Sequence, residues 1–135
     1  MDRRKKSKSV ILAVRGILYL PEKEGCLMLK RTPSYEGDPL ANYWELPGGK
    51  FDAGDLYVRT ALVIEFLEET GIPISTINDP LYIWDAPDGI DKYEGNHYLC
   101  IFYSVNLVYP NISDVTLNKK EHSEYKWVKI PEDMK

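Results

Sequence analysis

The sequence predicts a single mixed α+β domain in which β-strands surround one long helix. Three observations support this class. The chain has 135 residues, of which 44% are hydrophobic and 12% aromatic, which suffices for one core without disulfides. Strand-like apolar runs stand before and after a single helical pattern, and no βα unit or internal repeat recurs. The connecting segments are polar and rich in Pro and Gly. We expect a basic flexible tail at residues 1–9 and one domain over residues 10–135.

The N-terminal part is predicted to form a hairpin, a long loop and a short strand. Apolar runs at residues 10–20 and 26–29 flank the turn-forming sequence PEKEG. Residues 32–42 are rich in Pro, Gly and Asp, and a loop of this length in a small domain is often functional. The strand expected at residues 44–46 ends abruptly at the sequence PGG.

One long helix is predicted from Leu56 to Thr70. Asp55 stands where an N-cap residue belongs, and Asp52 is the alternative. Gly71, followed two residues later by a proline, is a stop signal. Strand-like runs then return at residues 81–84, 98–108 and 125–130. The last six residues, IPEDMK, have the pattern of another helix start.

The predicted helix has a charged face and an apolar face. Glu65, Glu68 and Glu69 are spaced i, i+3, i+4 and fall within an arc of about 100°. Like charges at this spacing weaken a helix unless a cation lies among them, although a solvated acidic face is the alternative. The residues expected to pack on the core are Val63, Ile64, Phe66 and Leu67.

The charge distribution excludes several classes of partner. The net charge is −4, but the tail holds five basic residues and one acid, which leaves 12 basic and 20 acidic residues elsewhere. Such an acidic body does not favour nucleic-acid phosphates, and no nucleic-acid partner is expected. Apolar runs such as Val10 to Val14 are too short for a membrane span. Two distant cysteines favour a reducing, cytoplasmic location, and two histidines exclude a histidine-rich metal cage.

The PGG sequence precedes the acidic face by about one helix length. Gly48 and Gly49 can turn tightly and bring a backbone carbonyl close to the carboxylates. Mg²⁺ and Mn²⁺ prefer oxygen ligands of this kind and leave coordination positions for substrate phosphate. An ordinary turn is the alternative for PGG alone. A bound cation would supply the positive charge that the acidic body lacks.

These segments resemble the Nudix box, the signature of the Nudix (MutT-like) hydrolase family. The box has the form G-x5-E-x7-R-E-U-x-E-E-x-G-U, where U is aliphatic. Residues 44–50 (WELPGGK) and 65–72 (EFLEETGI) are similar to its two ends, and the strand order fits the family's fold over residues 10–130. The resemblance implies a Nudix fold, in which a mixed curved β-sheet is sandwiched with a central catalytic helix.

The resemblance also implies a site for Mg²⁺ or Mn²⁺. The implied catalytic and metal-binding carboxylates are Glu65, Glu68 and Glu69, with the carbonyl of Gly48 as a further ligand. A stretch that is similar to one in many Nudix hydrolases, EHSEYKWV, begins at Glu121. By that resemblance Glu121 is a further ligand or a general base, and Glu124 is the second candidate. The alternative for Glu121 is a surface acid beside two lysines.

Three further residues are expected to contact substrate. By the resemblance, Arg31 and Lys50 lie where the family contacts phosphates, although a strand-end surface charge is the alternative for Arg31. Trp44 is the expected contact to a nucleobase. The other aromatic residues that could stack on a base are Tyr43, Tyr82, Trp84 and Tyr98. Aromatic residues in strands are nevertheless more often part of a core.

The chain departs from the box at three points. Asp55 stands where the family has Glu, one residue is inserted near the helix start, and Ile64 stands where the family has Arg. In the family, the Glu at the position of Asp55 and the Arg at the position of Ile64 brace the loop against the helix. Asp55 and Arg59 are four residues apart and can supply a substitute pair, with a solvent-facing Arg59 as the alternative.

The predicted function is metal-dependent hydrolysis of a nucleoside diphosphate linked to another group, with water attacking a pyrophosphate bond. The expected substrate is a nucleoside triphosphate, a dinucleoside polyphosphate or a similar nucleotide. The protein is expected to act as a monomer or homodimer, without a membrane partner. One alternative is a catalytically weak Nudix domain that binds a nucleotide as a sensor, which the departures motivate. Another is an RNA-processing member guided to RNA by the basic residues 3–8.

Overall fold

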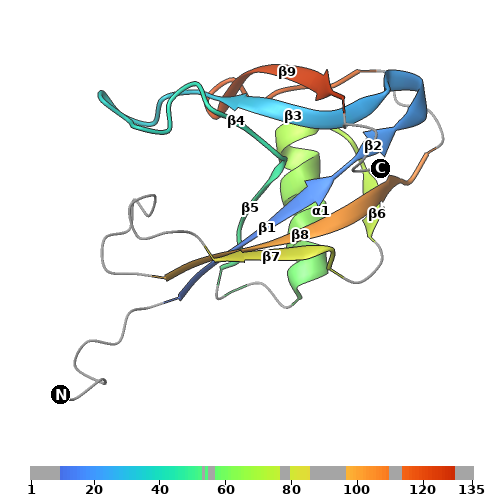
Figure 1. The fold of residues 1–135 in the computed structure, drawn as a ribbon, viewed down its shortest axis with the longest axis horizontal. Helices are drawn as coiled ribbons and strands as arrows, with labels where there is room; N and C mark the ends of the chain where they lie inside the picture. The colour runs from blue at the N-terminus through green and yellow to red at the C-terminus, as the bar shows by residue number, and fades with distance from the viewer. Residues whose placement is uncertain are drawn as a thin grey trace.

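The central helix α1 (Val58–Thr70) lies between two β-sheets (Figure 1). The computed structural model describes residues 10–52, 54, 57–76, 80–85, 97–109 and 114–129. In this part of the chain the strands are β1 (Val10–Ile17), β2 (Tyr19–Leu20), β3 (Gly25–Arg31), β4 (Trp44–Glu45), β5 (Gly48–Lys50), β6 (Ile74–Thr76), β7 (Tyr82–Asp85), β8 (His97–Leu107) and β9 (His122–Val128). Strands thus precede and follow the helix, and the α+β class is confirmed.

One sheet is built around the parallel pair of β1 and β8. The pairing runs from Val10 opposite His97 to Ile17 opposite Ser104. β5 pairs antiparallel with β1. β7 and β6 pair antiparallel with successive parts of β8. This arrangement brings the PGG segment, which contains the start of β5, beside the middle of β1.

The second sheet is built around β3. One edge of β3 pairs with β9, and the other edge pairs first with β2 and then with β4, all antiparallel. The connection from β2 to β3 is the 3-10 turn η2 (Pro21–Lys23), closed by Glu24 in the left-handed region at a φ of 54°. The predicted hairpin is therefore confirmed. In Figure 1, β3 and β9 lie above the upper end of α1, and β1, β7 and β8 cross its lower part in the view.

The core lies where α1 meets both sheets. Leu62 and Phe66 on the helix are fully buried. They belong to a cluster with Val14 from the first sheet and with Leu27 and Leu29 from the second. Because buried apolar contacts of this kind stabilise a helix more than its intrinsic propensity does, the two sheets fix the position of α1.

The helix ends where the sequence predicts but begins later. Gly71 has a φ of 73°, and its N–H donates to the carbonyl of Leu67, so the predicted stop is confirmed. The N-cap residue is Tyr57, which has an extended backbone and makes no side-chain cap bond. The predicted cap at Asp55, with Asp52 as the alternative, is therefore wrong; Asp55 itself lies outside the described residues.

The buried face of the helix differs from the predicted one. Ile64 and Leu67 were expected to pack on the core, but they are 48% and 46% exposed. Glu69 and Thr70 are buried instead. The Thr70 hydroxyl donates to the carbonyl of Phe66 and accepts the N–H of Ile72, so polar contacts at the end of the helix help set its rotation. Apolar periodicity alone does not contain this information.

Two short strands are not predicted from the sequence. β5 begins at Gly48, where PGG has the pattern of a stop, because glycine is a poor strand former. β6 is three residues long and gives no alternating pattern. β9 begins at His122, three residues before the predicted start. The expected tail at residues 1–9 and the helix start expected in IPEDMK both lie outside the described residues.

Candidate active site

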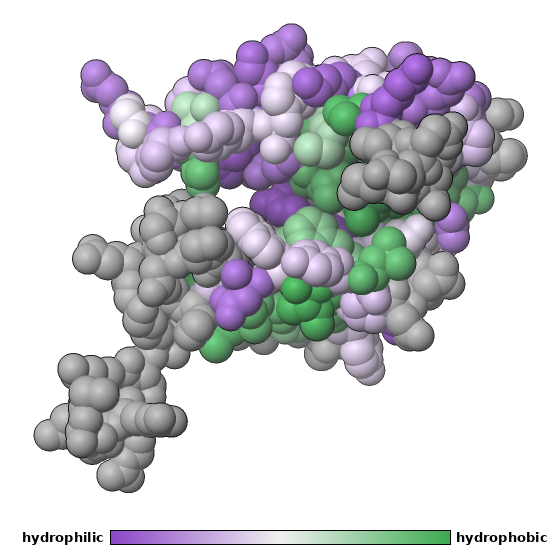
Figure 2. Space-filling model, viewed as in Figure 1, coloured by the Kyte–Doolittle hydropathy of each residue, from purple (hydrophilic) through white to green (hydrophobic). Residues whose placement is uncertain are grey.

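A cleft of about 1010 Å³ lies between the two sheets and reaches α1. In Figure 2 the surface is hollowed between the upper and lower layers. The predicted site residues that line the cleft are Arg31, Trp44, Gly48, Lys50, Glu65, Glu69 and Glu121. We call Gly48, Gly49, Glu65 and Glu69 the helix wall, and residues 31–43 the loop wall. Glu68 is exposed and does not line the cleft.

Glu69 is a buried carboxylate in contact with the PGG segment. Its side chain accepts the N–H of Gly48 at 3.0 Å, and only 6% of the residue is exposed. Burial raises the pKa of Glu69 to about 7, although the Gly48 N–H and the nearby His122 and Arg15 act in the opposite direction. Gly48 has a φ of 152°, and a Cβ there would overlap the carbonyl oxygen of Val14. Only glycine fits this approach.

Glu65 lies against the next residue of the same segment. A Cβ added to Gly49 would lie 2.8 Å from Oε2 of Glu65, so the absence of a side chain lets the loop approach the carboxylate. The predicted closeness of PGG to the acidic helix is confirmed. The Gly48 group seen in contact with a carboxylate is its N–H, whereas its role as a carbonyl ligand stays a prediction.

Glu121 and His122 approach Glu69 from the opposite sheet. One ligand atom from each of these three residues lies within 4.8 Å of the other two. Glu121 is held at the start of β9 by its backbone, which donates to Asn118 and accepts from Thr32. Glu124, the second candidate, instead forms an exposed pair with Lys30 at 3.0 Å. The geometry favours Glu121 over Glu124 as the further carboxylate of the site.

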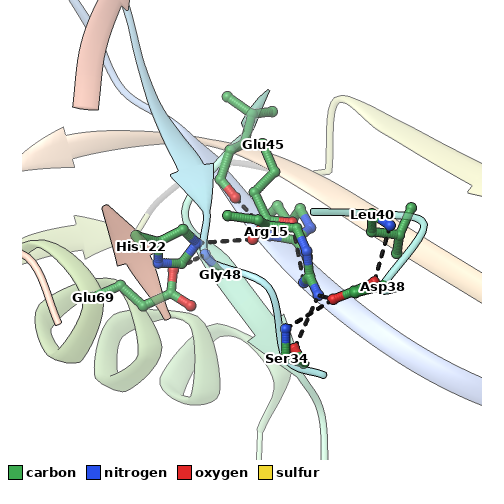
Figure 3. A network of polar contacts seen from close by, with 10 residues as sticks. Arg15, Ser34, Asp38, Leu40, Glu45, Gly48, Glu69 and His122 are labelled. Carbon is green, nitrogen blue, oxygen red and sulfur yellow. Dashed lines mark hydrogen bonds and ion pairs between the residues drawn. The ribbon is translucent and has the colours of Figure 1, made fainter. Parts of the chain in front are cut away.

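A buried polar network, which the sequence analysis did not identify, supports this group (Figure 3). Glu45 contacts Nε2 of His122 at 2.8 Å and the guanidinium of Arg15 at 3.4 Å. Arg15 also donates to the carbonyl of Leu46 at 2.6 Å. Burial alone would raise the pKa of Glu45, but the His122 hydrogen bond and the charges of Arg15 and Arg31 hold it below its usual value. The only sequence signal is an arginine inside the apolar run of β1.

Arg31 connects this network to the loop wall. Its guanidinium lies 3.9 Å from Glu45 and 3.5 Å from Asp38. The buried Asp38 carboxylate also accepts the backbone N–H groups of Ser34 and Leu40, which closes the loop on itself. These two N–H groups and the charge of Arg31 lower the pKa of Asp38 despite its partial desolvation. Arg31 is therefore a fixed cation that lines the cleft.

The structure separates the aromatic candidates. Tyr43, Trp44, Trp84 and Tyr98 line the cleft, whereas Tyr82 does not and is 61% exposed. The ammonium of Lys126 lies 4.0 Å from the centre of the Trp44 ring, which fits a cation–π contact on one face of that ring. Base stacking on any of these rings stays a prediction.

The departures from the box are only partly described by the structure. Ile64, at the position of the family's Arg, is exposed on α1. The guanidinium of Arg59 lies 5.6 Å from the centre of the Tyr103 ring. Because Asp55 lies outside the described residues, the substitute pair with Arg59 stays a prediction.

The residues present fit a divalent cation. Glu69 is a buried acid with a raised pKa, and Nδ1 of His122 is buried without a hydrogen-bond partner among the described residues. Carboxylates converge on this point from α1 and from the start of β9, while cationic side chains stand elsewhere around the cleft. The arrangement can hold a cation beside a bound phosphate chain.

The comparison with protein families defines the class. The NUDIX domain model matches residues 11–133. The chain therefore belongs to the Nudix family, and the resemblance found in the sequence is confirmed.

Similar individual proteins share the fold at low sequence identity. The MutT protein of Methanosarcina mazei is 26% identical and has a TM-score of 0.72, with 91% of this chain and 79% of that chain covered. The MutT NUDIX hydrolase of Burkholderia pseudomallei is 22% identical at a TM-score of 0.69, with 93% and 89% covered. A C. elegans Ap4A hydrolase is 23% identical at a TM-score of 0.66, with 88% and 80% covered.

One relative was found by sequence. It is an uncharacterized 17.7 kDa protein of Enterobacteria phage T4, 34% identical over 88 residues. The match covers 65% of this chain and 55% of the phage protein, so it spans about half the length of that relative. Among the described residues, no helix is long and apolar enough to cross a membrane.

Proposed function

We propose that the protein hydrolyses a pyrophosphate bond of a nucleoside diphosphate linked to another group, with water as nucleophile and Mg²⁺ or Mn²⁺ as cofactor. The observation that supports this most strongly is the buried Glu69 carboxylate on the Gly48 N–H, with Glu121 and His122 within 4.8 Å. Glu69 forms no ion pair with a side chain in the described part of the chain, and a bound cation would stabilise its charged form. Membership of the Nudix family supports the same function.

The carboxylates of the site have different environments and therefore different proposed roles. Glu69 is the innermost metal ligand, and Glu121 binds from the opposite side of the cleft. Glu65 lines the cleft against Gly49, and exposed Glu68 offers a ligand from the solvent side. When bound, a divalent cation neutralises phosphate charge and lowers the pKa of water. Glu65 or Glu121 accepts the proton that the attacking water loses.

The remaining cleft residues are proposed to bind the substrate. Arg31, fixed between Glu45 and Asp38, and Lys50, at the end of β5, contact phosphate oxygens. Trp44, with Lys126 on one face of its ring, contacts the nucleobase. Solved structures of this fold include an Ap4A hydrolase and a UDP-X diphosphatase. The fold alone therefore does not identify the group that is attached to the nucleoside diphosphate. A panel of substrates is needed to identify it.

Phosphate release from a panel of nucleoside triphosphates, dinucleoside polyphosphates and nucleotide sugars tests the proposal. We expect turnover by the wild type with Mg²⁺ or Mn²⁺ and none with chelator. Glu69→Gln should lose more than about 100-fold in turnover, which exceeds the usual effect of removing an outer-shell partner. Glu22→Gln, which removes an equal charge in the exposed turn η2, is the matched control and should retain activity.

Two results would contradict the proposal. Undiminished turnover in Glu69→Gln would show that Glu69 is not a ligand of the catalytic metal. Saturable nucleotide binding without turnover of any substrate would instead favour a nucleotide-binding sensor.

A further inference from the structure

We infer that His122 supplies a nitrogen ligand to the cation held by Glu69, and that the site therefore prefers a first-row transition-metal dication to Mg²⁺. The inference rests on the proposed function, because it concerns the same cation. It adds a residue and a ligand type that the Nudix resemblance does not imply. Four features of the structure support it.

The first feature is the orientation of the His122 ring. Nε2 lies 2.8 Å from Oε1 of Glu45, and a carboxylate accepts hydrogen bonds. A ring that carries one proton therefore has it on Nε2, which leaves the lone pair on Nδ1. Nδ1 is buried and has no hydrogen-bond partner in the described part of the chain. The side chain of His122 is only 3% exposed, so bulk water does not readily satisfy this atom.

The second feature is the convergence of ligand atoms. One ligand atom each from Glu69, Glu121 and His122 lies within 4.8 Å of the other two. Three ligands at about 2.1 Å from one ion are on average at most about 3.6 Å apart. The two carboxylate oxygens and a ring nitrogen of His122 must therefore draw together by up to about 1.2 Å to share one cation. Figure 3 shows the Glu69 carboxylate next to the His122 ring, on the side away from Glu45.

The third feature is the support behind the ring. A metal-binding histidine usually donates its other ring N–H to a carboxylate, which fixes the ring and its tautomer. Glu45 is in this position, and it is held in turn by Arg15 at 3.4 Å and by Arg31 at 3.9 Å. Glu45 is thus a positioning residue for His122.

The fourth feature is the chemistry of the ligand set. Mg²⁺ binds through oxygen and keeps several waters, whereas imidazole nitrogen suits transition-metal ions. Among first-row dications the affinity of such a site rises from Mn²⁺ to Co²⁺, and an imidazole ligand favours each of them over Mg²⁺. Glu69, Glu121 and His122 leave further coordination positions open for phosphate oxygens.

Pulsed electron paramagnetic resonance on protein loaded with Mn²⁺ tests the nitrogen ligand directly. We expect nitrogen modulation from an imidazole in the wild type and its loss in His122→Gln, whose amide can still donate to Glu45. The chain has only two histidines, so His97→Gln is the matched control and should keep the modulation. Labelling His97→Gln protein with ¹⁵N-histidine should change the nitrogen signal, which identifies the ligand even if His122→Gln fails to fold.

Cation affinity gives a second readout. Titration with Mn²⁺ and with Mg²⁺ should show a loss of about tenfold or more in Mn²⁺ affinity for His122→Gln, but less than about threefold for Mg²⁺. Mn²⁺ binding without nitrogen modulation would overturn the inference and leave the proposed function intact. The same holds for modulation that is lost only in His97→Gln. Absence of any Glu69-dependent cation binding would overturn the proposed function as well.

Discussion

The two walls of the cleft are held by different kinds of contact. The helix wall depends on close backbone approach, since Gly48 lies against Val14 and Arg15 of β1, and Gly49 against Glu65, without room for a Cβ. The loop wall depends on charge pairs, in which Asp38 closes the loop and holds Arg31. The helix wall presents acids and the loop wall presents a cation. Under the proposed function, the cation site and the phosphate-binding side therefore have separate structural supports, and substitutions should separate their effects.

The largest effect on stability is expected at Gly48. In Gly48→Ala the new methyl group would overlap the Val14 carbonyl at a φ that disfavours alanine. We expect a loss of roughly 2–4 kcal/mol in the free energy of unfolding, measured in urea. The matched control is Gly54→Ala, because a Cβ there meets nothing within 4 Å. Equal stability of the two variants would show that β5 can move away from β1 at little cost.

The pH dependence of stability reports on the charge of Glu69. Folding raises its pKa from 4.5 to about 7, so the metal-free folded state holds this proton more tightly than the unfolded state. The resulting contribution to the free energy of unfolding is fully present below pH 4.5 and is lost as the pH rises through about 7. The total loss is up to about 3 kcal/mol.

The difference between wild type and Glu69→Gln isolates this effect, because the lowered pKa values of Asp38 and Glu45 act equally in both. The free energy of unfolding of the wild type should therefore fall relative to that of Glu69→Gln as the pH rises from 4 to 8, because glutamine mimics the protonated acid and does not titrate. Added Mn²⁺ should restore the wild type at the high end of this range. A pH-independent difference would contradict the burial of an ionisable group at this position.

A change in the loop wall should affect substrate binding more than turnover. Asp38→Asn removes the negative charge beside Arg31 and one of the two acceptors for the loop N–H groups. We expect KM to rise by about tenfold, equivalent to about 1.4 kcal/mol, with kcat changed by less than about threefold. Glu36→Gln, in the same loop, is the charge-matched control. A fall in kcat with constant KM would place the loop wall in the chemical step.

The smallest effect is expected at Lys126. Lys126→Met removes the cation over Trp44 but keeps an apolar side chain there. A cation–π contact contributes about 0.5–1 kcal/mol, so KM should rise by about two- to fivefold. Lys129→Met, at an exposed pair with Glu24, is the control. An unchanged KM would show that Lys126 does not contribute to substrate binding through the Trp44 ring.

The sequence predicts the features that depend on local pattern. The hairpin, the end of the helix at Gly71 and the approach of PGG to the acidic face all follow from residue type and spacing. The helix rotation does not, because it depends on which polar side chains find partners across the core. Glu69 and Thr70 are buried for this reason, while Ile64 and Leu67 are exposed.

The Arg15–Glu45–His122 network is also beyond local pattern. Its members come from β1, β4 and β9, and they meet only after both sheets have formed. Charged residues inside short strands signal that inward-facing polar contacts exist, but not which partners they have. The helix wall is therefore largely predictable from sequence, whereas its support from the second sheet is not.

The most direct test of a cation held by Glu69 is the anomalous difference map of a crystal grown with Mn²⁺ and a non-hydrolysable nucleoside triphosphate analogue. We expect a Mn²⁺ peak within coordination distance of the Glu69 carboxylate, with phosphate oxygens between it and Arg31. A Mn²⁺ ion bound elsewhere, with Glu69 contacting only Gly48, would contradict the account.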